Sequence, residues 1–135
     1  MKRVVLDASA VMTFFEDRPG AEKVQELLGG AVAGRLELSL SAVNWGEVYY
    51  SIWCAKGRDA AERTIADIAQ LPLEIVAADF ELTKLAAELR AQHKLPYADC
   101  FAAALAQQRK AIVATADQDF TQVEQIVNIM WTTED

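Results

Sequence analysis

Short apolar runs alternate with longer helix-patterned segments along the whole chain, and this alternation limits the folds that the chain can adopt. The run at residues 3–6 ends at Asp7, and a similar run at residues 111–114 leads to Asp117. Strands of this kind, separated by helices, are typical of a parallel sheet that is covered on both faces. The sequence therefore predicts a three-layer α/β/α fold with a central, mainly parallel sheet.

The expected elements follow one another without a linker, an internal repeat or a low-complexity segment. We expect strands at residues 3–6, 36–40, 73–76, 111–114 and 127–131, with the last strand at an edge of the sheet. We expect helices at residues 8–15, 21–33, 59–70, 79–92 and 96–109, and a further helix from Ser41 or Asn44 to residue 55. Glycines at 29, 30 and 34 are expected to end the second helix. With 135 residues, we expect residues 1–135 to form a single domain around one core.

The composition indicates a chain with a well-filled interior. Hydrophobic residues make up 53% of the sequence, which argues against disorder. No apolar run approaches the roughly 20 residues of a membrane span, and the short run before Asp7 does not resemble a secretory signal peptide. The two cysteines, Cys54 and Cys100, are too few for a disulfide framework. We therefore expect a cytoplasmic protein without a membrane segment.

The charge balance limits the ligands that the chain can hold. The formal net charge is −7, which argues against a protein that binds nucleic acid through its overall charge. Either the ligand is not a polyanion, or local cations such as bound metal ions contribute to its binding. Composition does not decide between these two alternatives.

Two of the expected strands lead directly into aspartates. Asp7 follows the first strand, and Asp117 follows the strand at residues 111–114, with Asp119 two residues later. In open parallel sheets, ligands bind in the crevice beyond the carboxyl ends of the strands. Each aspartate also has a purely structural interpretation as the N-cap of a following helix, as does Ser9 for the first helix. For any one of them alone, the capping interpretation is the stronger.

Two further acids lie in apolar helices. Glu47 is surrounded by aromatic and aliphatic residues, and with Asn44 it fits a capping box. Asp99 lies near the start of an alanine-rich helix, where its interaction with the helix dipole contributes roughly 0.3–1 kcal/mol. Burying an unpaired carboxylate costs several kcal/mol. If that helix is buried, Asp99 therefore needs a cation or several hydrogen-bond donors.

The four acids together indicate a metal site more strongly than any of them does alone. No Lys or Arg lies three or four residues after Asp7, Glu47 or Asp99. Carboxylates that converge without a basic partner repel one another, and a divalent cation relieves that repulsion. Oxygen ligands suit Mg²⁺ or Mn²⁺ rather than zinc. The single histidine, His93, does not indicate a nucleophilic catalytic system.

Four short motifs occur in a fixed order on this α/β pattern. They are Asp7-Ala-Ser9, Asn44-x-x-Glu47, Pro96-x-x-Asp99 and Thr115-x-Asp117-x-Asp119-Phe120. In order, spacing and chain length the sequence resembles the PIN domain, and most closely the VapC toxins of bacterial and archaeal toxin–antitoxin pairs. The resemblance covers essentially the whole chain.

The resemblance implies a metal-dependent endoribonuclease that cleaves RNA phosphodiester bonds and acts as a toxin that inhibits translation. The residues that match the family's acidic quartet are Asp7, Glu47, Asp99 and Asp117. Of these, we expect Asp7, Asp99 and Asp117 to bind Mg²⁺, with Mn²⁺ as a substitute. Glu47 is expected to position or deprotonate the attacking water, or to bind the metal through water. The residues that match supporting positions are Ser9, Thr115 and Asp119.

The resemblance also implies partners. It implies a homodimer and a cognate VapB-like antitoxin that inserts a helix and a basic tail. One group of hydrophobic residues is large for a single small core. Its members are Phe14, Phe15, Val24, Leu27, Leu28 and Trp53. Core packing accounts for most of them, and any that are exposed are expected to form a groove for a partner helix. A set of basic residues has two interpretations: they contact RNA phosphates, or they lie at solvated helix ends. They are Lys56, Arg58, Arg63, Lys94, Arg109 and Lys110.

Other functions fit the sequence less well. Aspartyl-phosphate phosphatases need a second acid two residues after the first, and here that residue is Ser9. A dinucleotide-binding domain needs a glycine-rich turn after the first strand, which is absent. One alternative stays open: a non-catalytic, acidic PIN-like module that binds metal or protein. An Asp99 variant distinguishes this module from a nuclease, because in a nuclease it should lose cleavage and keep partner binding.

Overall fold

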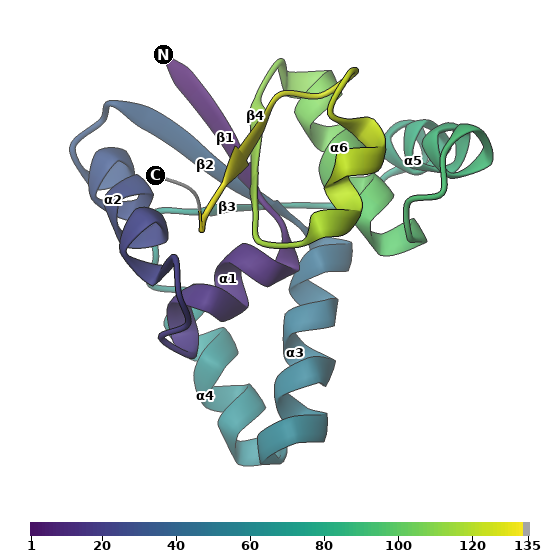
Figure 1. The fold of residues 1–135 in the computed structure, drawn as a ribbon. Helices are drawn as coiled ribbons and strands as arrows, with labels where there is room; N and C mark the ends of the chain where they lie inside the picture. Colours follow the sequence, from purple (N-terminus) through teal and green to yellow (C-terminus); the bar gives the residue numbers. More distant parts are fainter. Residues whose placement is uncertain (134–135) are drawn as a thin grey trace.

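The structure is a computed structural model that describes residues 1–133. Its strands form one five-stranded sheet in the order β3-β2-β1-β4-β5 over this range (Figure 1). The strands are β1 (Lys2–Leu6), β2 (Leu36–Ser41), β3 (Glu74–Val76), β4 (Ile112–Thr115) and β5 (Ile129–Trp131). Every pair of neighbouring strands is parallel. The predicted parallel sheet is confirmed, with β5 at one edge.

Helices cover both faces of the sheet. They are α1 (Ala8–Phe15), α2 (Ala21–Val32), α3 (Ala42–Lys56), α4 (Arg58–Ile68), α5 (Phe80–Gln92), α6 (Tyr97–Arg109) and the 3₁₀ helix η1 (Gln118–Val123). Val5 and Val113 pack with residues of α5, α6 and η1, whereas Val4, Leu6 and Ala114 pack with residues of α1, α2, α3 and α4. Because side chains alternate across a strand, β1 and β4 contribute to both cores. The three-layer prediction is confirmed.

The central strands bring two chain segments together at one edge of the sheet. Leu6 is paired with Ala114, so the carboxyl ends of β1 and β4 lie side by side. The next residue, Asp7, donates its backbone N–H to the carbonyl of Ala114 at 3.4 Å. The turns that follow β1 and β4 are therefore neighbours, although more than 100 residues separate them in the sequence.

Helix α6 is almost entirely buried against the sheet. Residues 100–106 are each 4% exposed or less, and the helix contacts β1, β2 and β4. Four of these residues are alanines, whose small side chains allow a close approach of helix to sheet. Pro96 precedes the first helical residue, where its fixed backbone angle suits a helix start. This packing buries Asp99 in the first turn of α6, although Tyr97 in the same turn is exposed.

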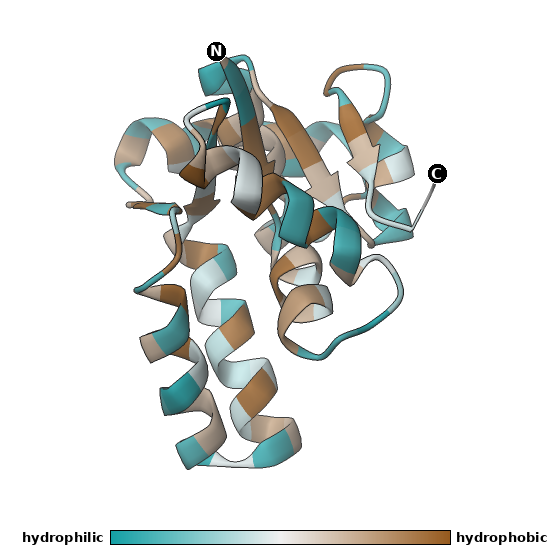
Figure 2. Ribbon diagram, turned by 90° about the vertical axis from the view of Figure 1, so that its left-hand side faces the viewer, coloured by the Kyte–Doolittle hydropathy of each residue, from teal (hydrophilic) through white to brown (hydrophobic). Residues whose placement is uncertain are grey.

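The hairpin of α3 and α4 projects beyond the carboxyl edge of the sheet (Figures 1 and 2). Figure 2 also shows hydrophobic stretches in the strands, whereas the helices of the hairpin alternate between hydrophobic and hydrophilic residues. Of the hydrophobic residues expected in either a core or a groove, Val24, Leu27 and Leu28 are buried, whereas Trp53 is 42% exposed. Phe14 and Phe15 are partly buried and pack against the same core as these three, so the core interpretation holds for five of the six residues.

The predicted end of the second helix at residue 33 agrees with the structure to one residue, and Gly34 follows with a positive φ of 77°, but Gly29 and Gly30 do not end the helix. Helix α2 continues through Gly29 and Gly30 and ends at Val32. A Cβ atom on Gly30 would lie 2.9 Å from Cδ2 of Leu36. Gly30 therefore permits the close packing of α2 against β2 rather than ending the helix.

Helix length and cysteine state agree with the composition. Within residues 1–133, every helix is too short or too polar to cross a membrane. Cys54 is exposed, Cys100 is buried, and both are free thiols.

Candidate metal centre

Asp7 caps α1 and is buried at 1% exposure. Its Oδ1 accepts a hydrogen bond from the backbone N–H of Ala10 at 2.9 Å, as the capping interpretation predicted. Two hydroxyl groups also donate hydrogen bonds to the Asp7 carboxylate. Thr115 Oγ1 donates to Oδ2 at 2.6 Å, and Ser9 Oγ lies 2.8 Å from Oδ1 and 2.9 Å from Oδ2. Burial raises the pKa of Asp7 to about 6, although the bonds from Thr115, Ala10 and Ser9 oppose the rise.

The same two hydroxyls join the turns after β1 and β4. Ser9 Oγ accepts from the backbone N–H of Ala116 at 2.9 Å, and Thr115 Oγ1 accepts from that of Asp117 at 2.9 Å. The two hydroxyl oxygens lie 3.1 Å apart. Asp7 and the segment that carries Asp117 are therefore held together by a continuous hydrogen-bond network.

Glu47 comes from α3 and is half-buried. The predicted capping box of Asn44 and Glu47 is wrong, because Ser41 caps this helix and accepts from the backbone N–H of Asn44 at 3.1 Å. The side chain of Asn44 instead donates to Glu47 Oε1 at 2.8 Å. Burial raises the pKa of Glu47, the bond from Asn44 opposes this rise, and the charge of Asp117 adds to it.

Asp99 lies in the first turn of α6 and is 7% exposed. Desolvation, the negative charges of Asp117, Asp7 and Glu47, and a hydrogen bond with Asp117 raise the pKa of Asp99 from 3.8 to about 8. The helix dipole alone is therefore insufficient to keep this carboxyl group ionised. Because the charges of Asp117, Asp7 and Glu47 all act on Asp99, the four acids predicted from the sequence lie in one region of the molecule.

Asp117 caps η1, with Oδ1 accepting from the backbone N–H of Asp119 at 2.9 Å. Oxygen atoms of Asp99, Asp117 and Asp119 lie within 4.8 Å of one another. The sequence suggested Asp7 as the third metal ligand and Asp119 as a supporting residue. In the structure, Asp119 belongs to the close group and Asp7 lies outside it, because the oxygens of Asp7 are turned toward the start of α1 and the hydroxyl network.

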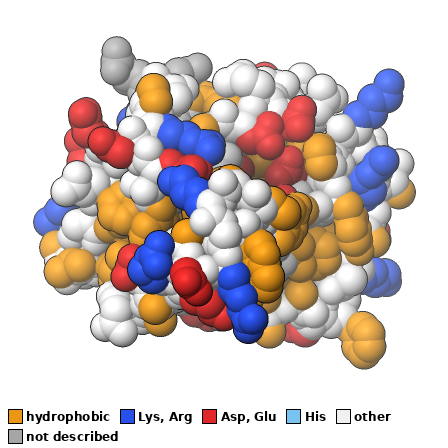
Figure 3. All heavy atoms as spheres, turned by 90° about the horizontal axis from the view of Figure 1, so that it is seen from below, with side chains coloured by type: hydrophobic (Ala, Val, Ile, Leu, Met, Phe, Trp, Pro, Cys, Tyr) orange, Lys and Arg blue, Asp and Glu red, His pale blue; other side chains and the backbone are white. Residues whose placement is uncertain are grey.

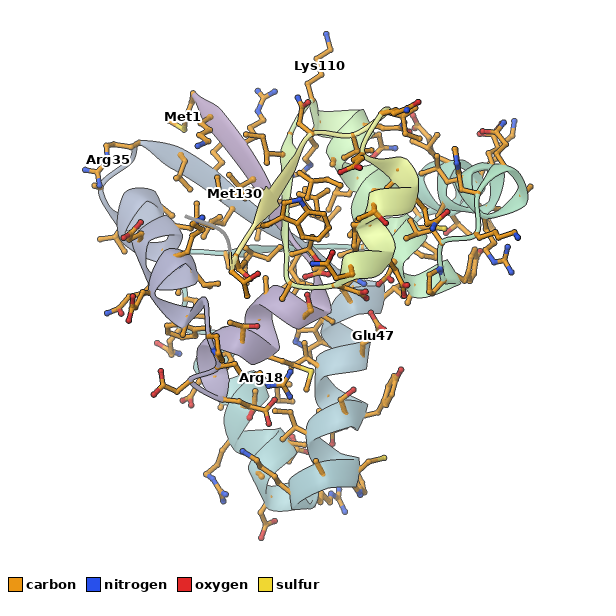
Figure 4. The ribbon with its side chains drawn as sticks, in the orientation of Figure 1. Met1, Arg18, Arg35, Glu47, Lys110 and Met130 are labelled. Carbon is orange, nitrogen blue, oxygen red and sulfur yellow. The ribbon has the colours of Figure 1, made fainter. Side chains whose placement is uncertain are left out.

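The acids have no basic counterpart among residues 1–133. The ion pairs of this part of the chain join Arg3 to Glu37, Arg18 and Lys56 to Glu16, and Arg109 to Glu74. Lys110 projects from the top of the molecule in Figure 4, far above Glu47. Seen from below, acidic side chains form a group with hydrophobic side chains beside it (Figure 3). Of the basic residues considered for phosphate contact, Lys56 and Arg109 are thus engaged in ion pairs, and Lys110 is remote from the acids.

The donor set fits a divalent cation. Negative charge is left uncompensated in the site, because carboxylate oxygens cluster there and the described chain offers them no basic partner. The strongly raised pKa of Asp99 reflects this repulsion. Mg²⁺ and Mn²⁺ prefer oxygen ligands, and either ion would offset this charge. The site therefore has the chemical character that its sequence predicted, whereas the role of each residue in it stays a prediction.

The sequence as a whole matches one family model. The model of the PIN domain matches residues 4–126. No curated protein matches the chain by sequence.

Solved structures share the fold at low sequence identity. VapBC2 from Rickettsia felis, solved with a DNA fragment from its promoter, has a TM-score of 0.74 and 17% identity, covering 96% of this chain and 98% of its own. A toxin–antitoxin complex from Klebsiella pneumoniae has a TM-score of 0.73 and 18% identity, covering 98% and 99%. VapC20 from Mycobacterium tuberculosis, a toxin that cleaves the sarcin–ricin loop, has a TM-score of 0.71 and 15% identity, covering 87% and 92%.

Proposed function

The chain belongs to the PIN domain family, and on that premise we propose that it is a metal-dependent endoribonuclease that hydrolyses RNA phosphodiester bonds. The observation that carries the proposal is the close approach of carboxylate oxygens of Asp99, Asp117 and Asp119, within 4.8 Å of one another, at the carboxyl edge of a parallel sheet. Asp7 and Glu47 lie near enough to act on Asp99 through their charges. Ligands of such sheets bind at this edge. The acids come from four separate elements, which is the arrangement of a site rather than of a helix cap.

Asp7, Asp99 and Asp117 would hold Mg²⁺ or Mn²⁺, with Asp119 near enough to Asp99 and Asp117 to take part. The ion would neutralise charge on the phosphate and lower the pKa of a water molecule, so that no histidine is needed. Asp7 also fixes the start of α1 through its bond from Ala10. This keeps the turn after β1 in place while the other acids face the substrate.

Glu47 is the residue suited to position or deprotonate the attacking water. It is half-buried, so that water reaches it, and one of its oxygens is already held by Asn44 at 2.8 Å. Its second oxygen, Oε2, has no hydrogen-bond partner within residues 1–133 and is free to accept from water. The hydrogen bond from Asn44 favours the ionised form, which is the form that a base requires.

We further propose that the protein is the toxin of a toxin–antitoxin pair and that it inhibits translation. The likeness of its fold to the VapBC and VapC structures supports this proposal. Its partner would be a VapB-like antitoxin with an apolar helix and a basic tail. A groove of about 350 Å³ beside α3 and α4 is lined mainly by Trp45, Ile65, Ala66, Ile68, Ala69 and Ile75. The net charge of −7 and the acidic cluster favour a cationic tail. A homodimer, a cytoplasmic location and a single domain belong to the same proposal.

Purified protein tests the nuclease proposal. We expect cleavage of RNA with Mg²⁺ or Mn²⁺, no cleavage in EDTA, and loss of cleavage in Asp7→Asn and Asp99→Asn. Asp67→Asn, an exposed acid on α4, is the matched control and should retain full activity. Cleavage that persists in EDTA or in both site variants contradicts the proposal. If no RNA is cleaved but the antitoxin still binds, the alternative of a non-catalytic acidic module is correct.

A further inference from the structure

Asn44 is a fully buried amide whose hydrogen-bonding groups are all used. It lies in the first turn of α3 and is 0% exposed. Its Oδ1 accepts from Ser41 Oγ at 2.8 Å. Its Nδ2 donates one hydrogen to Glu47 Oε1 at 2.8 Å and the other to the backbone carbonyl of Ala98 at 3.0 Å. A buried amide is costly unless it is bonded in this way.

These bonds connect two elements that each carry an acid of the candidate centre. Glu47 lies one turn further along α3, while Ala98 lies in the first turn of α6, directly before Asp99. Both partners of Nδ2 are acceptors, so the orientation of the amide group is fixed by its surroundings. The side chain therefore links the Glu47 carboxylate to the backbone that carries Asp99.

The helix start does not account for this side chain. Ser41 already provides the N-cap of α3, and the Asn44 side chain accepts no backbone N–H of the helix. The bond to Ala98 joins residues 54 positions apart, which a local capping role does not require. The sequence showed only an Asn three residues before a Glu. The signal that the sequence interpretation missed was a polar side chain at a buried position of this helix.

We propose that Asn44 is a positioning residue that fixes the spacing between the carboxylates of Glu47 and Asp99, so that Glu47 lies beside the divalent cation that Asp99 would hold. The proposal rests on the proposed function for the cation, and on the hydrogen bonds for the spacing. The amide holds Oε1 of Glu47, whereas Oε2 has no hydrogen-bond partner within residues 1–133. It also ties the start of α6 to α3, so that neither acid moves independently of the other.

The test compares Mn²⁺ affinity, measured by calorimetry on the full chain, in wild type, Asn44→Ala and Asn44→Ser. Loss of a residue that supports a metal ligand typically weakens metal binding by about 10–100-fold, and we expect a loss in this range for Asn44→Ala. Asn44→Ser is the second variant in case the alanine variant fails to fold, because its hydroxyl has one hydrogen to donate where the amide has two. We expect a smaller loss of affinity for the serine variant.

A matched control separates positioning from general loss of stability. Thr64 on α4 is also buried at 9% exposure and donates to the Ala60 carbonyl at 2.9 Å, within the projecting hairpin. Thr64→Val should lower the unfolding temperature without changing Mn²⁺ affinity. In a double-mutant cycle, Asn44→Ala and Glu47→Gln together should weaken Mn²⁺ binding by less than the product of their separate effects, because Asn44 acts through Glu47.

Wild-type Mn²⁺ affinity in a folded Asn44→Ala or Asn44→Ser variant overturns the proposal, as does an effect that combines multiplicatively with Glu47→Gln. If the wild-type protein itself does not bind Mn²⁺, the metal part of the proposed function fails. The spacing is then tested by a crystal structure of the Asn44 variant. A changed Glu47 rotamer or a shifted first turn of α6 supports the positioning role, and unchanged positions of Glu47 and Asp99 refute it.

Discussion

Substitution of Asp99 by Asn should stabilise the metal-free protein at alkaline pH. The change removes one negative charge from a buried cluster and keeps the shape of the side chain. In wild type, Asp99 is desolvated and faces the charges of Asp117, Asp7 and Glu47, which raise its pKa from 3.8 to about 8. The asparagine variant lacks this penalty at every pH.

The direction of the pH dependence follows from the raised pKa. The folded carboxyl group binds its proton more tightly than the unfolded one. The contribution of Asp99 to stability is therefore fully present at low pH and falls as the pH rises from 3.8 to about 8. At about 1.4 kcal/mol for each pKa unit, the full difference corresponds to roughly 6 kcal/mol. The exposed position of Asp119 shows that solvent reaches the cluster, and with that screening we expect about 1–3 kcal/mol.

Urea unfolding in EDTA, at pH values from about 5 to about 9, measures this difference, because the interval spans the raised pKa of Asp99. Asp99→Asn should be more stable than wild type at the upper end, and the two proteins should converge as the pH falls. Saturating Mg²⁺ should reverse the order, because a ligand at a hundredfold excess over its Kd stabilises the protein that binds it by about 2.7 kcal/mol. Asp67→Asn on α4 is the control and should follow wild type throughout.

Parallel pH profiles for wild type and Asp99→Asn in EDTA would refute the reasoning, since they would show that Asp99 carries no excess repulsion when folded. A variant that is less stable than wild type at alkaline pH would refute it more directly. In that case Asp99 would contribute a favourable interaction, such as a helix-dipole contact, that outweighs its burial.

Two smaller predictions concern packing and the hydroxyl network. Gly30→Ala should lower the free energy of unfolding by about 1–2 kcal/mol, because its Cβ would lie 2.9 Å from Leu36 Cδ2. By contrast, Gly29→Ala should raise it by about 0.5–1 kcal/mol, because outside the neighbouring helix backbone no heavy atom of the described chain lies within 4 Å of that Cβ. Urea unfolding of both variants tests the pair, and equal effects would contradict the prediction. Thr115→Val removes the 2.6 Å bond to Asp7 and should weaken Mn²⁺ binding by about 10-fold or more, measured by calorimetry; unchanged affinity would show that this hydroxyl does not support the centre.

The order of strands and helices was predictable because it depends on local patterns. Apolar runs of four or five residues, separated by segments of helical length, limit the chain to a parallel sheet with helices on both faces. The first helix was predicted at residues 8–15, where the structure has α1. The glycines in α2 were misread, because the need for a close approach at Gly30 arises from Leu36 on β2 and is not visible in the helix itself.

The sequence by itself also determined which acids to consider. A parallel sheet places the residues that follow its strands at one edge, so Asp7 and Asp117 were expected together, and the cost of a buried charge singled out Asp99. Only the tertiary structure decided how these groups are held. Three features join residues whose distance depends on how α3, α6 and η1 pack on the sheet. They are the hydrogen bonds of Ser9 and Thr115 to Asp7, the nearness of Asp119 to Asp99, and the bond from Asn44 to Ala98. Packing of this kind is a sum of many weak long-range contacts, and no local pattern records it.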